Sequence, residues 1–166
     1  MCIRDRIVYA CRSARTNEEL LDQFCYFMVY DKILFDAVDA NDVPIYHTNV
    51  MMAVGTTFVV ICLDSIKDLT QRAAVVNSFE ATNKEIIEIT LEQMGNFAGN
   101  MLQVKNTDGD HFLIMSTRAN KALTKTQIEL IEKHTQILHS DLKVIETYGG
   151  GSARCMMAEV FLSEKV

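Results

Sequence analysis

The sequence of 166 residues contains no tryptophan and a single proline, Pro44, which favours regular strands and helices joined by short turns. Positive charge is also scarce, since 16 Lys and Arg face 22 Asp and Glu and give a net charge of −6. Nucleic acids and anionic lipid surfaces bind basic proteins, so neither is an expected partner. The length and the hydrophobic content of 49% are those of one folded domain.

Cysteine pairs are missing as well. The five cysteines are Cys2, Cys11, Cys25, Cys62 and Cys155. An odd number excludes a complete disulfide framework, and the lack of a C-x-x-C pair argues against the usual zinc spacing. We therefore predict free thiols, no metal site and a reducing, cytoplasmic location. The longest apolar run, 50–63, is too short to cross a bilayer, which needs about 20 residues.

Turn and strand signals predict an α/β fold with a repeated order of strand, strand, helix, strand. This pattern occurs over 45–89 and again over 101–145. Two strands, 45–54 and 58–63, flank Gly55-Thr56-Thr57, and the second is so apolar that both of its faces should be buried. In the other repeat, Asp108-Gly109 between apolar runs predicts a hairpin.

Local signals also predict where helices begin and where the last strands lie. Three capping boxes mark helix starts, at Thr16 with Glu19, Thr90 with Gln93 and Thr124 with Gln127. The last of these helices is expected to extend to Leu138. Strands are expected at 142–145 and 156–162.

The N-terminus does not follow this pattern. Residues 1–6 resemble nothing that follows, and a strand at 7–11 then leads directly into a helix and a strand at 32–38. We predict that residues 1–6 are an unrelated leader. We also predict that the unit formed by the strand at 7–11, the helix and the strand at 32–38 lacks its opening strand.

His47 and Asn49 are polar residues in an otherwise apolar segment, and strand alternation would place them on one face. Buried polar groups need hydrogen-bond partners, so a pair of them is either a site or a satisfied part of the core. From the spacing alone, a core histidine is the favoured interpretation.

Cys155 follows Gly149-Gly150-Gly151 and adjoins Arg154. The glycines allow a close approach of the backbone to a ligand, and a nearby positive charge stabilises a thiolate. A cysteine with a distant histidine is a common pair in covalent catalysis, and the alternative is an inert thiol after a flexible connection. No phosphate loop or dinucleotide fingerprint is present, which gives no indication of a cofactor.

Three motifs together resemble one family. They are Tyr-His-Thr-Asn-Val-Met-Met at 46–52, Phe-Ala-Gly-Asn-Met-Leu at 97–102 and Gly-Gly-Gly-Ser-Ala-Arg-Cys-Met at 149–156. They resemble the penteins, or guanidino-group-modifying enzymes, and especially the amidinotransferase-like hydrolases of citrulline utilisation, relatives of arginine deiminase and dimethylarginine dimethylaminohydrolase. The resemblance implies a pentein-type α/β propeller of five ββαβ units. Residues 7–166 would be its C-terminal part, with the N-terminal units missing.

The resemblance also implies a function and a site. Cys155 takes the position of the nucleophile and His47 that of the general acid/base, while Asn49 and Ser152 take substrate-binding positions. The expected reaction is hydrolysis of a guanidino or ureido C–N bond in a small arginine-like or citrulline-like molecule, without metal or organic cofactor. The family's acidic substrate-binding residues have no match here, so this truncated chain could instead be a non-catalytic binding module with the pentein fold.

Two expectations about geometry follow. His47 and Cys155 lie 108 residues apart and should face one cavity. Missing units should leave Ile7, Val8 and Phe35 exposed at a broken edge.

Overall fold

The computed structural model describes residues 1–159, which form three small sheets of three strands each. The first unit consists of β1 (Cys2–Arg4), β2 (Ile7–Cys11), α1 (Glu18–Met28) and β3 (Asp31–Phe35). Strand β1 pairs with β2 in antiparallel fashion, and β3 pairs with β2 in parallel after the crossover through α1. This unit thus contains one hairpin and one helical crossover.

The other two units repeat this order. The second consists of β4 (Met52–Val54), β5 (Phe58–Ile61), α2 (Leu69–Ala81) and β6 (Glu85–Glu88). The third consists of β7 (Leu102–Lys105), β8 (His111–Ser116), α4 (Thr117–Ala122), α5 (Lys125–Glu132) and β9 (Gln136–Ser140), after the short helix α3 (Leu91–Gly95). The α/β class and the ββαβ repeat are confirmed, with three units and no closed ring among the described residues.

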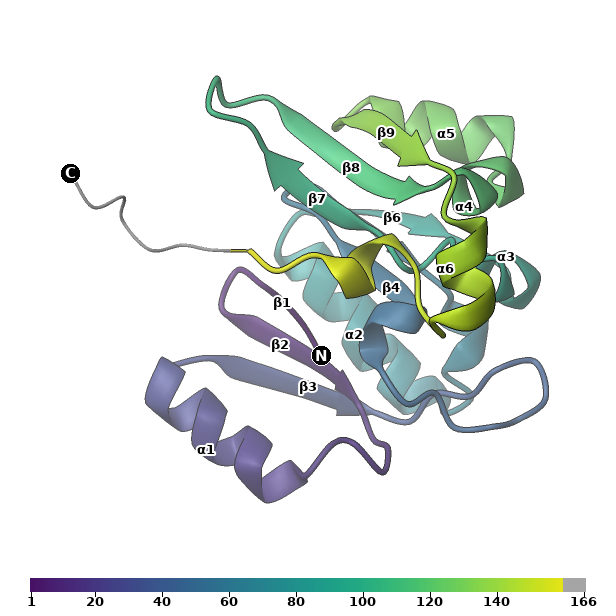
Figure 1. Ribbon diagram of the computed structural model, residues 1–166. Helices are drawn as coiled ribbons and strands as arrows, with labels where there is room; N and C mark the ends of the chain where they lie inside the picture. The colour runs from purple at the N-terminus through teal and green to yellow at the C-terminus, as the bar shows by residue number, and fades with distance from the viewer. Residues whose placement is uncertain (160–166) are drawn as a thin grey trace.

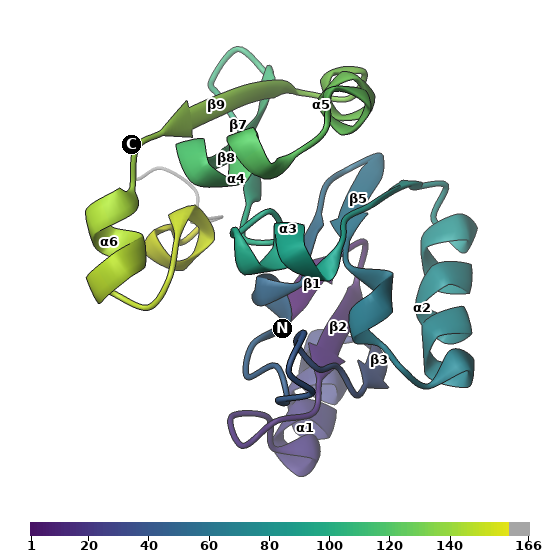
Figure 2. The ribbon, with the colours of Figure 1, turned by 90° about the vertical axis from the view of Figure 1, so that its right-hand side faces the viewer.

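The three units are stacked so that their opening strands are neighbours. In Figure 1 they follow one another from bottom to top, and β4 lies against both β1 and β7. Figure 2 shows α1, α2 and α5 toward the outside of the molecule, away from α6 (Lys143–Tyr148) and the 3₁₀ turn η3 (Ala153–Met156). One apolar core runs through all three units, from Tyr9 and Phe35 through Phe58 to Leu113. None of the described helices has the length and apolar character needed to cross a membrane.

Strand β1 corrects the expectation that the first unit lacks its opening strand. Cys2 pairs with Tyr9 and is buried, and its thiol donates a hydrogen bond to the carbonyl of Met52 at 3.5 Å. Arg4 also reaches the second unit, where its guanidinium donates to the carbonyl of Val54 at 3.4 Å. Residues 2–4 therefore take the position of an opening strand. That residues 1–6 are an unrelated leader concerns their origin and stays a prediction.

The expected strand at 45–54 is wrong over most of its length. Only Met52–Val54 are extended, and Thr48–Val50 form the 3₁₀ turn η1. The turn arises because the hydroxyl of buried Thr48 accepts a hydrogen bond from the backbone N–H of Cys11 at 3.0 Å. His47 and Asn49 consequently lie before and within a turn, and not on one face of a strand.

The chain after α5 also differs from expectation. Helix α5 ends at Glu132, Leu138 lies in strand β9, and the predicted strand at 142–145 lies at the start of α6. The carboxylate of Asp141 accepts a hydrogen bond from the backbone N–H of Lys143 at 3.0 Å, which turns the chain at this start. In the predicted strand at 156–162, Met156 ends η3, and residues from 160 onward lie outside the described range.

Two of the three capping boxes are confirmed, at Thr90 with Gln93 and at Thr124 with Gln127. The first is wrong, because Asn17 caps α1 and the hydroxyl of Thr16 donates to the carbonyl of Cys11. The prediction that β5 is buried on both faces is correct, since its four residues are fully buried.

The predicted broken edge is wrong for Val8 and Phe35, which are fully buried, while Ile7 is half-buried. Exposed apolar side chains gather instead on α1 and just after it. They are Leu20, Tyr26, Phe27, Met28 and Val29.

Candidate active site

The turn that carries His47 and Asn49 is fixed from two sides. Thr48 anchors it to the end of β2, as described above. On the other side, the backbone of Gly99 packs against it so closely that an added Cβ would lie 2.4 Å from the carbonyl oxygen of Val50. Only glycine fits this contact without displacing the turn.

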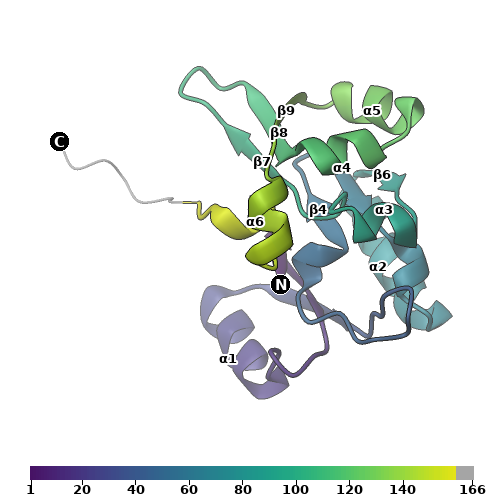
Figure 3. The same ribbon diagram turned by 45° about the vertical axis from the view of Figure 1, so that its right-hand side comes forward.

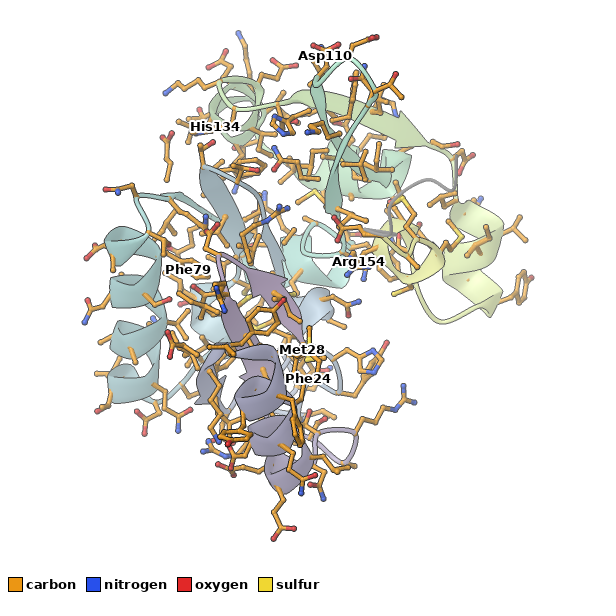
Figure 4. The ribbon with its side chains drawn as sticks, turned by 90° about the vertical axis from the view of Figure 1, so that its left-hand side faces the viewer. Phe24, Met28, Phe79, Asp110, His134 and Arg154 are labelled. Atoms are coloured by element: carbon orange, nitrogen blue, oxygen red, sulfur yellow. The ribbon has the colours of Figure 1, made fainter. Side chains whose placement is uncertain are left out.

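Cys155 lies on η3, after the glycine segment, and its side chain is exposed. Its backbone N–H donates to the carbonyl of Ser152 at 3.1 Å. Gly151 leaves room for the thiol, because an added Cβ there would lie 3.1 Å from the sulfur. Arg154 points its guanidinium to the carbonyl of Met157 at 3.1 Å, and Figure 4 shows this side chain at the turn.

Asn100 joins the two segments and was not among the residues predicted for the site. Its side chain is almost fully buried, and its Nδ2 donates to the carbonyl of Asn49 at 3.0 Å and to Sγ of Cys155 at 3.3 Å. Its Oδ1 accepts from the backbone N–H of Arg154 at 3.1 Å. The signal was present in the motif at 97–102, where asparagine follows the tightly packed Gly99.

Tyr46 makes a second link between the same segments. Its hydroxyl donates to the carbonyl of Gly150 at 3.3 Å, and its ring centre lies 5.0 Å from that of His47. The guanidinium of Arg15 lies over the Tyr46 ring at 4.9 Å. Residues 46–49 and 150–155 are therefore brought together, although about a hundred residues separate them in the sequence.

The environment of His47 favours its neutral form. The side chain is half-buried, and no hydrogen bond joins its ring to another described residue. Burial lowers the pKa of His47 below its ordinary value, and the positive charges of the N-terminus and Arg15 lower it further. A neutral imidazole near pH 7 can accept a proton.

The two residues predicted to bind substrate differ in what they leave free. The side-chain Oδ1 of Asn49 is buried and accepts no hydrogen bond from the residues that the structure describes, so its acceptor capacity is unused there. The hydroxyl of Ser152 is already used, since it is fully buried and donates to the carboxylate of Glu146 at 2.7 Å. Ser152 thus holds the loop before Cys155.

The larger pockets of the described chain, of about 760, 660 and 620 Å³, are lined by neither His47 nor Cys155. The structure brings their segments together, and a shared cavity between the two side chains stays a prediction. Within residues 1–159, no three His, Cys, Asp or Glu side chains are grouped as they would be around a metal ion.

A sequence model of the eukaryotic N,N dimethylarginine dimethylhydrolase family matches residues 1–162. Among curated proteins the chain has no significant match. Similar solved structures include the apo form of ArgZ, an arginine dihydrolase from the ornithine-ammonia cycle in cyanobacteria. The TM-score is 0.68, the sequence identity is 15%, and the match covers 90% of this chain and 22% of the ArgZ chain.

Two further structures give the same picture. The product-bound N-terminal domain of ArgZ has a TM-score of 0.67 and 16% identity over 90% of this chain and 50% of that one. AgrE with ornithine and NAD+ has a TM-score of 0.65 and 17% identity over 90% of this chain and 20% of that one. At such identities the similarity shows the fold, and the chain spans half or less of each of these structures.

Proposed function

Since the chain belongs to the N,N dimethylarginine dimethylhydrolase family, we propose that it carries the nucleophile and the acid/base of a hydrolase for guanidino or ureido C–N bonds. The observation that carries the proposal is the side chain of Asn100, which contacts both the Asn49 backbone and the Cys155 thiol. This contact holds the exposed sulfur of Cys155 beside the turn that follows His47. The imidazole of His47 is half-buried, and its lowered pKa favours the neutral form.

The first chemical step is addition of Cys155 to the planar carbon of the substrate. His47 accepts the thiol proton, a sulfur–carbon bond forms, and the electron pair of the C=N or C=O bond moves to its heteroatom. The electron pair on the heteroatom then reforms the double bond as the C–N bond breaks, and the imidazolium gives its proton to the departing amine.

The second step releases the product. His47, neutral again, takes a proton from water, and the hydroxide adds to the carbon bound to sulfur. This addition moves the electron pair of the double bond to its heteroatom. The pair then reforms the double bond as the sulfur–carbon bond breaks, and the thiolate recovers the proton from His47. Neither step needs a redox partner, because no atom changes its oxidation state overall.

Asn49 fits the role of a substrate contact. Its unpaired Oδ1 would accept an N–H from a guanidino or ureido group, which ends the cost of an unsatisfied buried acceptor. For Ser152 we propose a positioning role, because its hydroxyl is bound to Glu146 and its carbonyl holds the Cys155 N–H.

The similar structures support the chemistry by analogy. The N-terminal domain of ArgZ is described with a covalently bound reaction intermediate, and with substrate in a cysteine-to-serine mutant. We also propose the cysteine mechanism, an arginine-like or citrulline-like substrate, and a cytoplasmic location. That residues 7–166 are the C-terminal part of a longer domain is likewise a proposal, consistent with the partial coverage of ArgZ.

The decisive experiment is turnover of arginine, N,N-dimethylarginine and citrulline, followed as release of ammonia or dimethylamine. We expect Cys155→Ser to abolish turnover and Cys25→Ala, a change in a buried thiol on α1, to preserve it. Mass spectrometry of the trapped enzyme should place the covalent adduct on Cys155. Substrate binding without turnover or adduct would support the binding-module alternative, and full activity of Cys155→Ser would contradict the mechanism.

A further inference from the structure

A pocket of about 620 Å³ is lined by none of the proposed catalytic and substrate-binding residues, although it includes Glu146, the partner of Ser152. It opens between α3, α4 and α6, which lie next to one another in Figure 3. Its charged lining residues are Arg118, Lys121, Asp141, Lys143 and Glu146. The pocket therefore holds three positive and two negative side chains, and includes neither His47, Asn49 nor Cys155.

The positive side chains of this pocket, Arg118, Lys121 and Lys143, have no ion-pair partner within residues 1–159. Arg118 is nevertheless held in place, because its Nε donates to Oδ1 of Asn96 at 3.0 Å and its guanidinium lies 5.3 Å from the centre of the Phe97 ring. A guanidinium held in place and two ammonium groups without an ion pair, all at one pocket, match a carboxylate.

Glu146 provides the opposite charge in the same pocket. It is only 7% exposed, and one of its oxygens, Oε1, accepts the hydroxyl of Ser152 at 2.7 Å. The other oxygen, Oε2, is buried and has no hydrogen-bond partner in the described part of the chain. An unpaired carboxylate oxygen inside a protein is costly, and an ammonium group entering the pocket would satisfy it.

We infer that this pocket binds a small zwitterion of the α-amino acid class. The carboxylate of the ligand would lie among Arg118, Lys121 and Lys143, and its ammonium group would donate to Oε2 of Glu146. A simple anion would leave Oε2 unpaired, and a simple cation would leave the three positive side chains without a partner in a pocket that carries one more positive than negative side chain. This site does not depend on the proposed hydrolase chemistry, because it uses none of the same residues as reacting groups.

Nuclear magnetic resonance titration of the labelled chain tests the inference with L-norvaline, which has no guanidino or ureido group to hydrolyse. We expect saturable shifts of backbone amides in α4 and α6 with L-norvaline. Pentanoate lacks the ammonium group and butylamine lacks the carboxylate, so both should bind at least about tenfold more weakly. No saturable shift with L-norvaline, or equal binding of pentanoate or butylamine, would overturn the inference.

Variants locate the binding. Glu146→Gln can keep the bond from Ser152 but loses the charge, and should weaken L-norvaline binding by about tenfold or more. Exposed Lys121→Met should weaken it too, and exposed Lys125→Met on α5 serves as the control. Unchanged affinity in both pocket variants would refute the site. Cys155→Ser should bind L-norvaline as the unaltered chain does, so a failure of the hydrolase proposal is separable from a failure of this one.

Discussion

Cys62 directly follows strand β5, and Cys155 lies within the segment from Gly149 to Met157. The environments of these two cysteines are opposite. Cys62 is fully buried, and burial raises the pKa of its thiol. Cys155 is exposed on a turn, with the amide of Asn100 at its sulfur. The buried region contributes stability, whereas the glycine-containing segment gives up packing and leaves its thiol exposed.

The two regions also differ in how their shape is determined. Strand β5 is held by pairing with both β4 and β6 and by apolar side chains on both faces. The Cys155 turn is held by a few polar contacts from other parts of the chain, through Asn100, Tyr46 and Glu146. Changes in β5 should therefore affect the free energy of unfolding, and changes near Cys155 should affect reactivity.

Thiol labelling should give the largest difference between the regions. A buried thiol reacts only after the structure opens, and opening that costs about 4 kcal/mol slows the reaction roughly a thousandfold. We expect chloroacetamidine to modify Cys155 first and Cys62 about a thousandfold more slowly, as measured by mass spectrometry of peptides over time. Comparable rates at the two thiols would break the comparison.

The next largest effect is expected in β5 itself. Phe58 is fully buried, and its ring contacts Gly55 and stacks on His134 at 5.2 Å between ring centres. Phe58→Ala should lower the free energy of unfolding by about 3–5 kcal/mol in urea denaturation, because it leaves a cavity. Tyr148→Ala, at a residue that is 85% exposed, should change it by less than about 0.5 kcal/mol. A small effect at Phe58 would mean that β5 can repack.

Contacts of His134 should contribute to the loss of unfolding free energy expected for Phe58→Ala. It stands at the end of α5 and packs against the second unit (Figure 4). Its Nε2 lies 2.7 Å from a carboxylate oxygen of Glu85, and its Nδ1 lies 2.8 Å from the hydroxyl of Thr57. Truncation of Phe58 would therefore disturb the contact between the second and third units as well as the core.

What the sequence could predict follows the range of the interactions. The capping boxes at Thr90 and Thr124 act within one helical turn, and the apolar content of β5 is a local property, so all were predicted correctly. Residues 45–51 have a local composition similar to that of a strand, but they form no strand, and residues 48–50 form the 3₁₀ turn η1. The causes are distant in sequence, namely the hydrogen bond from Cys11 to Thr48 and the packing of Gly99 on Val50.

The same distinction applies to the candidate site. Motif resemblance indicated His47, Asn49, Ser152 and Cys155, but no local pattern could show that the Ser152 hydroxyl is bound to Glu146. The role of Asn100 depends on contacts to residues 51 and 55 positions away. Such contacts follow from the arrangement of the units, which spacing along the chain does not give.

Two glycines before β7, Gly99 and Gly95, should differ in how much their replacement changes the free energy of unfolding. Gly99→Ala would place a Cβ against the carbonyl of Val50 and displace the turn that follows His47, so we expect a loss of about 1–3 kcal/mol in the free energy of unfolding. Gly95→Ala is the matched control, because an added Cβ there meets no atom within 4 Å. It should be neutral or raise stability by up to about 1 kcal/mol. Equal effects of the two changes, in urea denaturation, would contradict the close packing of Gly99.

The smallest expected effect concerns the charge near His47. Burial, the N-terminus and Arg15 together lower the pKa of His47, so the folded chain binds a proton there less readily than the unfolded chain does. Stability at this site is therefore present above the unfolded pKa and decreases as the pH falls through it. Arg15→Gln removes one positive charge and should raise the pKa of His47, as followed by nuclear magnetic resonance of the imidazole protons.

Lys125→Gln, on the exposed face of α5, is the control for that titration and should leave the pKa of His47 unchanged. Because Arg15 also lies over the ring of Tyr46, its loss could loosen the link from Tyr46 to Gly150. Labelling of Cys155 in the same variant separates the two effects: a raised pKa with an unchanged labelling rate shows that Arg15 acts through its charge. A lowered or unchanged pKa of His47 would remove Arg15 from the electrostatics of the site.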